Sequence, residues 1–232
     1  MDNAVSINNP ISITSTQKVA ESNEKLIKFK RILRMTLTNT VNLNNRIKKR
    51  DLFSNSILIY YSIFLIVYSI TGKYFADYFN TTLAEYFNLI LSIVLLVFSL
   101  INNSANYGTR IQNSSEILHK LRNIRRTVDL NNYEEKELEY NEVIKDLESR
   151  SNGDFFKTLK SECKQNGTNW ISLTLLKANH CSTTEISKLR EHLCEIHPFL
   201  EQIKLIGEWL LYLILIFTPI LVFVLCFSIK LL

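Results

Sequence analysis

The sequence contains little of what most catalytic and phosphate-binding loops require. It has five glycines and three prolines in 232 residues, whereas loops that close around a phosphate group are usually rich in glycine. The nucleotide-binding patterns G-x-x-x-x-G-K-S/T and G-x-G-x-x-G are missing, as are the zinc-protease pattern H-E-x-x-H and the hydrolase pattern G-x-S-x-G. We therefore expect no catalytic residues and no cofactor, and we predict that the chain is not an enzyme.

Cysteine is also scarce. The chain has four cysteines, and the topology derived below assigns them to a reducing compartment or to the membrane, where structural disulfides are not expected. Two of them belong to a group of possible metal ligands between His180 and His197, which also contains His192, with the spacing H-C-x10-H-x-C-x2-H. This spacing matches no zinc-finger pattern, and we predict no metal site.

Charged residues are missing from three apolar runs, Ile57–Ile70, Phe87–Ile101 and Trp209–Ile229. Without Asp, Glu, Lys, Arg or His in these runs, a proton relay or ion-coupled transport lacks its usual residues. A hydrocarbon core of roughly 30 Å needs about 20 helical residues. The last run is long enough alone, and flanking aromatic residues such as Tyr74 and Tyr86 extend the other two. Each run is therefore expected to form a transmembrane helix.

From these runs we predict a transmembrane hairpin over residues 54–105 and a third, C-terminal transmembrane helix over residues 208–230. Ten Lys and Arg residues precede Ser54 against four acids, and the link between the first two runs has only Lys73 as a base. By the positive-inside rule, the N-terminus and residues 106–207 are cytoplasmic. No cleavable signal peptide is expected, because the first fifty-odd residues are polar.

The polar segments are expected to be helical as well. Residues 1–17 are predicted to form a disordered arm, residues 18–50 a basic amphipathic helix and residues 106–207 a cytoplasmic helical region. The apolar seam of residues 18–50, with Leu26 and Leu33, suits packing on the rest of the chain or on a second subunit, and a membrane-surface helix is equally allowed. Its basic excess indicates a bilayer partner with anionic lipids, and we expect no direct nucleic-acid binding because interleaved aromatic residues are missing.

The predicted fold is an all-α membrane protein. It comprises a transmembrane helical hairpin whose second helix extends into the cytoplasm, a small helical cytoplasmic part and a third, C-terminal transmembrane helix. The lack of any turn signal before Asp129 indicates that the second helix continues without a break to Val128. Residues 151–154 are expected to form a turn, and Pro219 a tolerated kink in the third span.

Small polar residues line one face of each hairpin helix at intervals of seven. The serines, followed by two asparagines, are Ser62, Ser69, Ser92, Ser99, Asn102 and Asn106. Two interpretations remain open. Small residues allow close helix packing, or the row faces water in an oligomer and lines a pore.

Two polar stretches carry a resemblance to a known family. They are NYGTRIQNSSEILHKL at residues 106–121 and YNEVIKDLESRSNGDF at residues 140–155. Together with a basic N-terminal helix and a hairpin with a short outer link, they make residues 26–160 similar to the SLATT domains of bacteria. The positions that carry the similarity are Tyr107, Arg110, Tyr140, Asn152 and Asp154. The third apolar run departs from the plainest members, which have two spans.

The resemblance implies a membrane effector of bacterial antiviral defence, located in the inner membrane as a multi-pass protein with a cytoplasmic N-terminus. Such an effector forms a homo-oligomer and permeabilises the membrane on a signal from a partner or a nucleotide, which causes abortive infection. The sensor would be a separate protein such as a reverse transcriptase or a nucleotide cyclase. The alternative is a membrane anchor or adaptor that holds a small cytoplasmic interaction domain at the bilayer.

Overall fold

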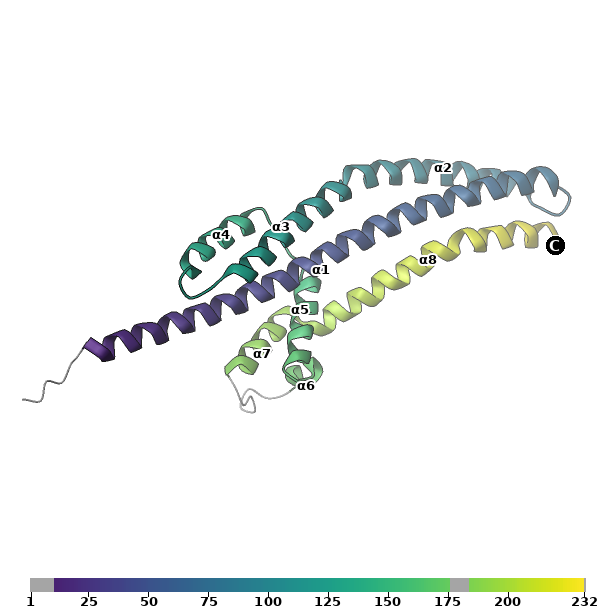
Figure 1. The fold of residues 1–232 in the computed structure, drawn as a ribbon. Coiled ribbons are helices and arrows are strands. Elements are labelled where there is room, and N and C mark those ends of the chain that lie inside the picture. The colour runs from purple at the N-terminus through teal and green to yellow at the C-terminus, as the bar shows by residue number, and fades with distance from the viewer. Residues whose placement is uncertain (1–10, 176–183, 232) are drawn as a thin grey trace, which may run out of the picture. The chain divides into compact units, whose positions relative to one another are not determined.

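The computed structural model describes residues 11–175 and 184–231, and all regular structure within these ranges is helical (Figure 1). The helices are α1 (Ile11–Tyr74), α2 (Thr81–Ser104), α3 (Tyr107–Thr127), α4 (Tyr133–Lys145), α5 (Asn152–Gln165), α6 (Trp170–Leu175), α7 (Thr184–Ile196) and α8 (Pro198–Leu231). The predicted all-α fold is confirmed. Three of the helices, α1, α2 and α8, contain stretches long and apolar enough to cross a membrane, as the three apolar runs predict.

The chain divides into two compact units. Unit 1 contains residues 1–41 and 113–150, and unit 2 contains residues 42–112 and 151–232. Helix α1 contributes residues to both units, and so does α3. Unit 2 therefore holds all three apolar runs.

Helix α1 starts earlier and runs further than expected. Residues 11–17, predicted to be disordered, are helical, while residues 1–10 lie outside the described part of the chain. No break separates residues 18–50 from the first apolar run. The reason is that no glycine or proline occurs between Pro10 and Gly72, and an existing helix gains one hydrogen bond for each residue that it adds.

The predicted unbroken helix through Val128 is wrong, because α2 ends at Ser104 and α3 begins at Tyr107. Asn106 lies between them with φ of 47°, in the left-handed region that asparagine enters more readily than most residues. The amide of Ala105 still donates to the carbonyl of Ile101 at 3.1 Å, so the break is sharp. A run of asparagines, poor helix formers, ends the helix without glycine or proline.

Unit 1 is a three-helix cluster of α1, α3 and α4 (Figure 1). The part of the apolar seam that belongs to unit 1 is buried here: Leu33 is fully buried and packs in one core with Leu121 and Ile124 of α3. Of the alternatives that the sequence leaves open, packing on the rest of the chain is the one observed for these residues. Tyr140 of α4 closes the core, with its ring edge-on to Phe29 at 5.7 Å.

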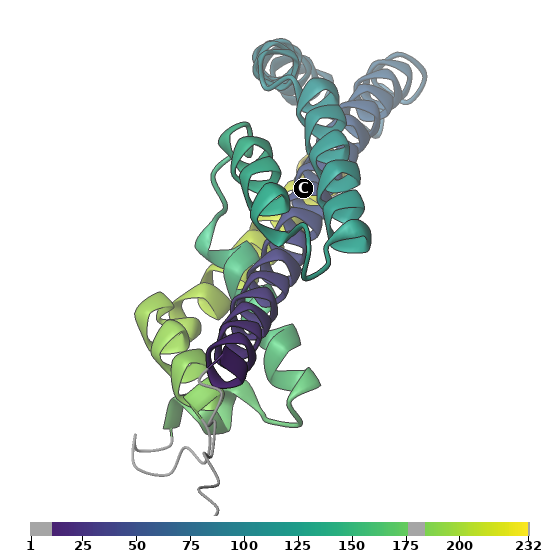
Figure 2. The same ribbon diagram turned by 60° about the vertical axis from the view of Figure 1, so that its left-hand side comes forward.

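In unit 2, α2 packs antiparallel to α1, whereas α8 packs parallel to it. Near one end, the rings of Phe53 in α1 and Tyr212 in α8 lie 3.9 Å apart. Near the other, Tyr68 is buried against α8, and the amide of Asn80 donates to the carbonyl of Cys226 at 3.0 Å. The short helices α5, α6 and α7 gather at the start of α8 (Figure 2). The loop between α1 and α2 and the end of α8 therefore share one end of this unit.

Three tyrosine hydroxyls of α1 attach it to the backbone of α8. Tyr60 donates to the carbonyl of Ile216 at 2.7 Å, Tyr61 to that of Leu215 at 2.6 Å and Tyr68 to that of Pro219 at 2.5 Å. Within a bilayer these carbonyls have no water to bind.

The position of Pro219 explains why Leu215 needs a partner. Proline has no N–H, so in a helix it leaves the carbonyl four residues earlier without its usual donor. In α8 that carbonyl belongs to Leu215, and the Tyr61 hydroxyl supplies the missing donor. The sequence marks Pro219 as a tolerated kink, and the structure shows which side chain makes it tolerable.

We predict that Tyr61→Phe destabilises the chain by about 0.5–1.5 kcal/mol and that Pro219→Ala removes most of this cost. Alanine restores an N–H at position 219, which can donate to Leu215. Unfolding free energies of the full chain in detergent micelles, measured as a double-mutant cycle, test the coupling.

Tyr60→Phe is the matched control. Its acceptor, Ile216, keeps its ordinary helical donor, the amide of Ile220, so its cost should be the same with and without Pro219. A Tyr61→Phe cost that does not change in the Pro219→Ala background would contradict the explanation.

Candidate functional site: polar residues of the spans and a basic cavity

The hairpin serines lie on exposed surface of unit 2, and most of their hydroxyls bond within their own helix. Ser62 donates to the carbonyl of Leu58 at 2.7 Å, Ser69 to that of Leu65 at 2.9 Å and Ser92 to that of Asn88 at 2.8 Å. Ser99 is exposed as well. Such bonds satisfy the hydroxyl locally, so the serines do not hold the hairpin together through their own donors.

Three side-chain hydrogen bonds cross between α1 and α2. Asn102, expected to line a pore, is half-buried and accepts a hydrogen bond from Ser54 at 2.6 Å while donating to Asn55 at 3.0 Å. The amide of Asn88 approaches the Ser69 hydroxyl at 3.4 Å. Asn102 therefore serves a contact inside the hairpin, and Asn106 lies in the turn after it.

The family-like positions serve different contacts. The guanidinium of Arg110 lies 5.7 Å from the centre of the Tyr107 ring, a distance that allows a cation–π contact. In unit 1, the hydroxyls of Tyr140 and Thr36 are 2.8 Å apart, so the tyrosine joins α4 to α1 by a hydrogen bond as well as by its ring.

Asp154 and Ser151 form a capping box at the start of α5, where the sequence predicts only a turn. The Ser151 hydroxyl accepts from the amide of Asp154 at 3.2 Å, and Asp154 Oδ2 accepts from the amide and hydroxyl of Ser151 at 3.4 and 2.9 Å. The pattern S-x-x-D before an apolar pair is the signal for this cap. Asn152 lies in the first turn of the helix and is exposed.

The carboxylate of Asp154 is fully buried and needs a cation. Arg46 of α1 supplies one: its Nε lies 3.0 Å from Asp154 Oδ2, in an ion pair that is not aligned as a hydrogen bond. The second oxygen, Oδ1, has no hydrogen-bond partner among the described residues. Asn42 adds bonds to the Asp154 carbonyl at 3.3 Å and the Thr158 hydroxyl at 3.0 Å. This cluster fixes α5 to α1.

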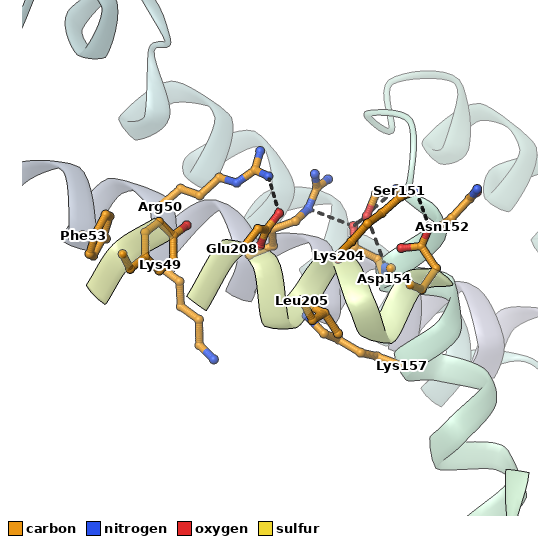
Figure 3. Close-up of a pocket in the computed structure, with 14 residues that line it drawn as sticks. Lys49, Arg50, Phe53, Ser151, Asn152, Asp154, Lys157, Lys204, Leu205 and Glu208 are labelled. Carbon is orange, nitrogen blue, oxygen red and sulfur yellow. Dashed lines mark hydrogen bonds and ion pairs between the residues drawn. The ribbon is translucent and has the colours of Figure 1, made fainter. Parts of the chain in front are cut away.

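A cavity of about 570 Å³ lies beside this cluster (Figure 3). Its charged lining consists of five bases and three acids, Arg46, Lys49, Arg50, Lys157, Lys204, Asp154, Glu201 and Glu208. The lining therefore carries a formal charge of +2. Three bases face acids: Arg46 faces Asp154 at 3.0 Å, Lys204 faces Glu201 at 2.8 Å and Arg50 faces Glu208 at 3.7 Å.

Sequence reasoning missed this cavity, although it noticed part of its composition. The basic residues at positions 46–50 indicate affinity for anionic lipid, but nothing in the sequence shows that α5 and α8 bring further charges to them. Among the acids of the cavity, only Asp154 is a position that carries the family resemblance. The charged residues of the cavity that the sequence does not place there include those of α8. This helix starts at Pro198, ten residues earlier than predicted. A proline in the first helical position explains this start.

No group of three potential metal ligands occurs in residues 11–175 and 184–231. His180 and Cys181, two members of the group noted in the sequence, lie outside these ranges. Cys163 is buried in α5, and burial raises the pKa of its thiol. The thiol is therefore a weaker nucleophile at neutral pH than an exposed cysteine.

The fold and these contacts describe a helical membrane protein with paired spans and a small polar helical part. The chain matches the SMODS and SLOG-associating 2TM effector domain family 5 over residues 22–225 and belongs to this family. It is thus a membrane effector domain. The match continues beyond residue 160, where the resemblance in the sequence was expected to end, and includes most of α8. No curated protein and no solved structure matches the chain.

We predict that Arg46→Met destabilises the chain by about 3–5 kcal/mol, because it leaves the buried Asp154 carboxylate without a cation. Adding Asp154→Asn removes the buried charge and should recover a large part of the loss. Arg50→Met, which breaks the exposed pair with Glu208, is the control and should cost less than about 1 kcal/mol.

Unfolding free energies in micelles would measure these differences. If Arg46→Met cost no more than Arg50→Met, the ion pair with Asp154 would not be what fixes α5.

Proposed function

We propose that this chain is a membrane effector of bacterial antiviral defence that oligomerises and permeabilises the inner membrane when a partner protein or nucleotide signals to it. The observation that carries the proposal is membership of a two-transmembrane effector family over residues 22–225. In this proposal the N-terminus is cytoplasmic, the loop between α1 and α2 faces outward, and membrane leakage ends the infection together with the cell.

The surface of the spans supports oligomerisation. In the most apolar stretches of α2 and α8, 11% of the residues are buried, and in that of α1 22% are. The hairpin therefore presents most of its surface to lipid or to other copies. Serine is a residue through which transmembrane helices pack closely, and Ser62, Ser69, Ser92 and Ser99 are all on exposed surface.

The hydrogen bonds of the serines suit a protein that rests before it acts. A hydroxyl bonded to its own helix can face lipid at little cost, since its donor is satisfied. When several copies bring their hairpins together, the same hydroxyls can accept bonds from water along a shared lumen. The helices that carry the serines can then keep the same structure in the resting chain and in the assembled pore.

The trigger comes from a separate protein in this proposal. The family is described as associating with SMODS and SLOG, and a nucleotide cyclase or a reverse transcriptase would supply the signal. The chain itself acts without catalysis: its work is assembly in the membrane. Unit 1, with its exposed α4, is the part we assign to the partner.

We predict that Ser62→Leu with Ser99→Leu abolishes permeabilisation, because leucine removes the polar lining of the lumen. The measurement is entry of a membrane-impermeant dye into cells after induced expression, together with fractionation to show that the protein still inserts. The unaltered chain should admit the dye, whereas a membrane anchor or adaptor should not.

Thr218→Leu with Ser228→Leu is the matched control. Both hydroxyls are exposed in α8 and bond to their own helix at 2.7 and 3.1 Å, so the change in apolarity is similar. The control should keep full dye entry. Equal dye entry with the hairpin pair replaced would show that these serines do not line the lumen.

A further inference from the structure

A second cavity lies next to the basic cavity, along the line where α1 and α8 meet. We call this line the α1–α8 seam. It has a volume of about 450 Å³ and lies between α1, α2 and α8. The two cavities share four lining residues, Arg50, Phe53, Glu208 and Tyr212. One cavity is charged and the other is mostly apolar, so a charged site and an apolar site adjoin each other here.

The charged cavity suits an anion. Lys49 and Lys157 make no ion pair with any residue that the structure describes, and both are exposed (Figure 3). Arg50 faces Glu208 at 3.7 Å with 45% of its side chain exposed, a weak pair that leaves donors for a ligand. The other two bases, Arg46 and Lys204, pair with the buried residues Asp154 and Glu201. Lys49 and Lys157 therefore remain for a phosphate group, while Arg50, which points the opposite way from Lys49 (Figure 3), adds positive charge to the cavity.

The apolar cavity suits a hydrocarbon chain. Val94, Leu95 and Phe98 of α2 form one wall, and Leu211 and Leu215 of α8 form another. Its few polar lining groups include Ser54 and Asn102, which are bonded to each other. An acyl chain here would replace contacts with bulk lipid by contacts with packed side chains.

The position of the seam along the chain matches the depth of a lipid headgroup. Arg50 is followed within seven residues by Ile57, where the first apolar run begins. A phosphate bound at Lys49, the residue before Arg50, would thus be level with the boundary between headgroups and hydrocarbon, while the apolar cavity lies further into the spans. Basic pockets between transmembrane helices bind anionic headgroups in this arrangement.

We propose that the two adjoining cavities bind one anionic phospholipid. Its phosphate is held by Lys49 and Lys157, Arg50 adds positive charge to the same cavity, and one acyl chain lies in the cavity between α1, α2 and α8. The adjoining apolar cavity favours a lipid over a free nucleotide or phosphate, which would use only the charged half. The site is independent of pore formation, since its residues differ from the hairpin serines.

The test is native mass spectrometry of the full chain released from zwitterionic detergent micelles, titrated with dioleoyl phosphatidylglycerol, dioleoyl phosphatidylcholine or ATP. We expect one phosphatidylglycerol to bind at least about tenfold more tightly than phosphatidylcholine. Lys49→Gln with Arg50→Gln and Lys157→Gln should remove this preference, and Val94→Trp, which fills the apolar cavity without changing charge, should weaken phosphatidylglycerol binding.

The control is Arg122→Gln with Arg125→Gln and Arg126→Gln on the exposed face of α3, which removes the same charge outside the cavities and should keep the preference. Equal binding of the two lipids, equal loss in both triple variants or insensitivity to Val94→Trp would overturn the proposal. So would ATP binding that displaces phosphatidylglycerol, because the charged cavity would then serve a free phosphate compound.

Discussion

The unit that holds the spans depends on one constraint, that a backbone carbonyl in hydrocarbon must find a donor. Pro219 breaks this condition for Leu215, and the hydroxyl of Tyr61 restores it from a different helix. Tyr60 and Tyr68 add two further bonds to the same stretch of α8. These bonds attach α8 parallel to α1, and Phe53 meets Tyr212 nearer the charged end of the same pair.

Hydroxyl groups serve two opposite purposes in these spans. The tyrosines reach from α1 to α8 and hold two helices together, whereas Ser62 and Ser92 bond within their own helices and hold nothing. Between α1 and α2 the polar contacts are few, with Ser54 and Asn102 at one end as the tightest. The hydrogen bonds from tyrosine hydroxyls to backbone carbonyls therefore join α1 to α8. The outer faces of the hairpin remain available for the assembly that we propose.

The features that depend on local composition could be predicted from the sequence. The contacts between segments far apart in the chain could not. Uncharged runs of apolar residues identify spans because the bilayer imposes length and polarity on each segment separately. The bond of Tyr61 to Leu215 and the ion pair of Arg46 with Asp154 join residues more than a hundred positions apart, and no periodicity reports such pairs. The sequence did not predict the break at Asn106 for a different reason. Asparagine ends this helix through its own backbone conformation, without the glycine or proline that marks a turn.

The third span then has a more specific role than attachment to the bilayer. Because α8 runs parallel to α1, its first turns lie beside the residues that precede the first span. Glu208 faces Arg50 there, and Glu201 lines the same cavity. An antiparallel helix would have placed these acids at the far end of the spans. The capping box of α5 adds Asp154 to the same place. The charged cavity thus requires α8 in this direction, and the tyrosine bonds around Pro219 attach α8 to α1 in it. This physical link makes α8 part of the effector unit, in keeping with a family match that continues into it.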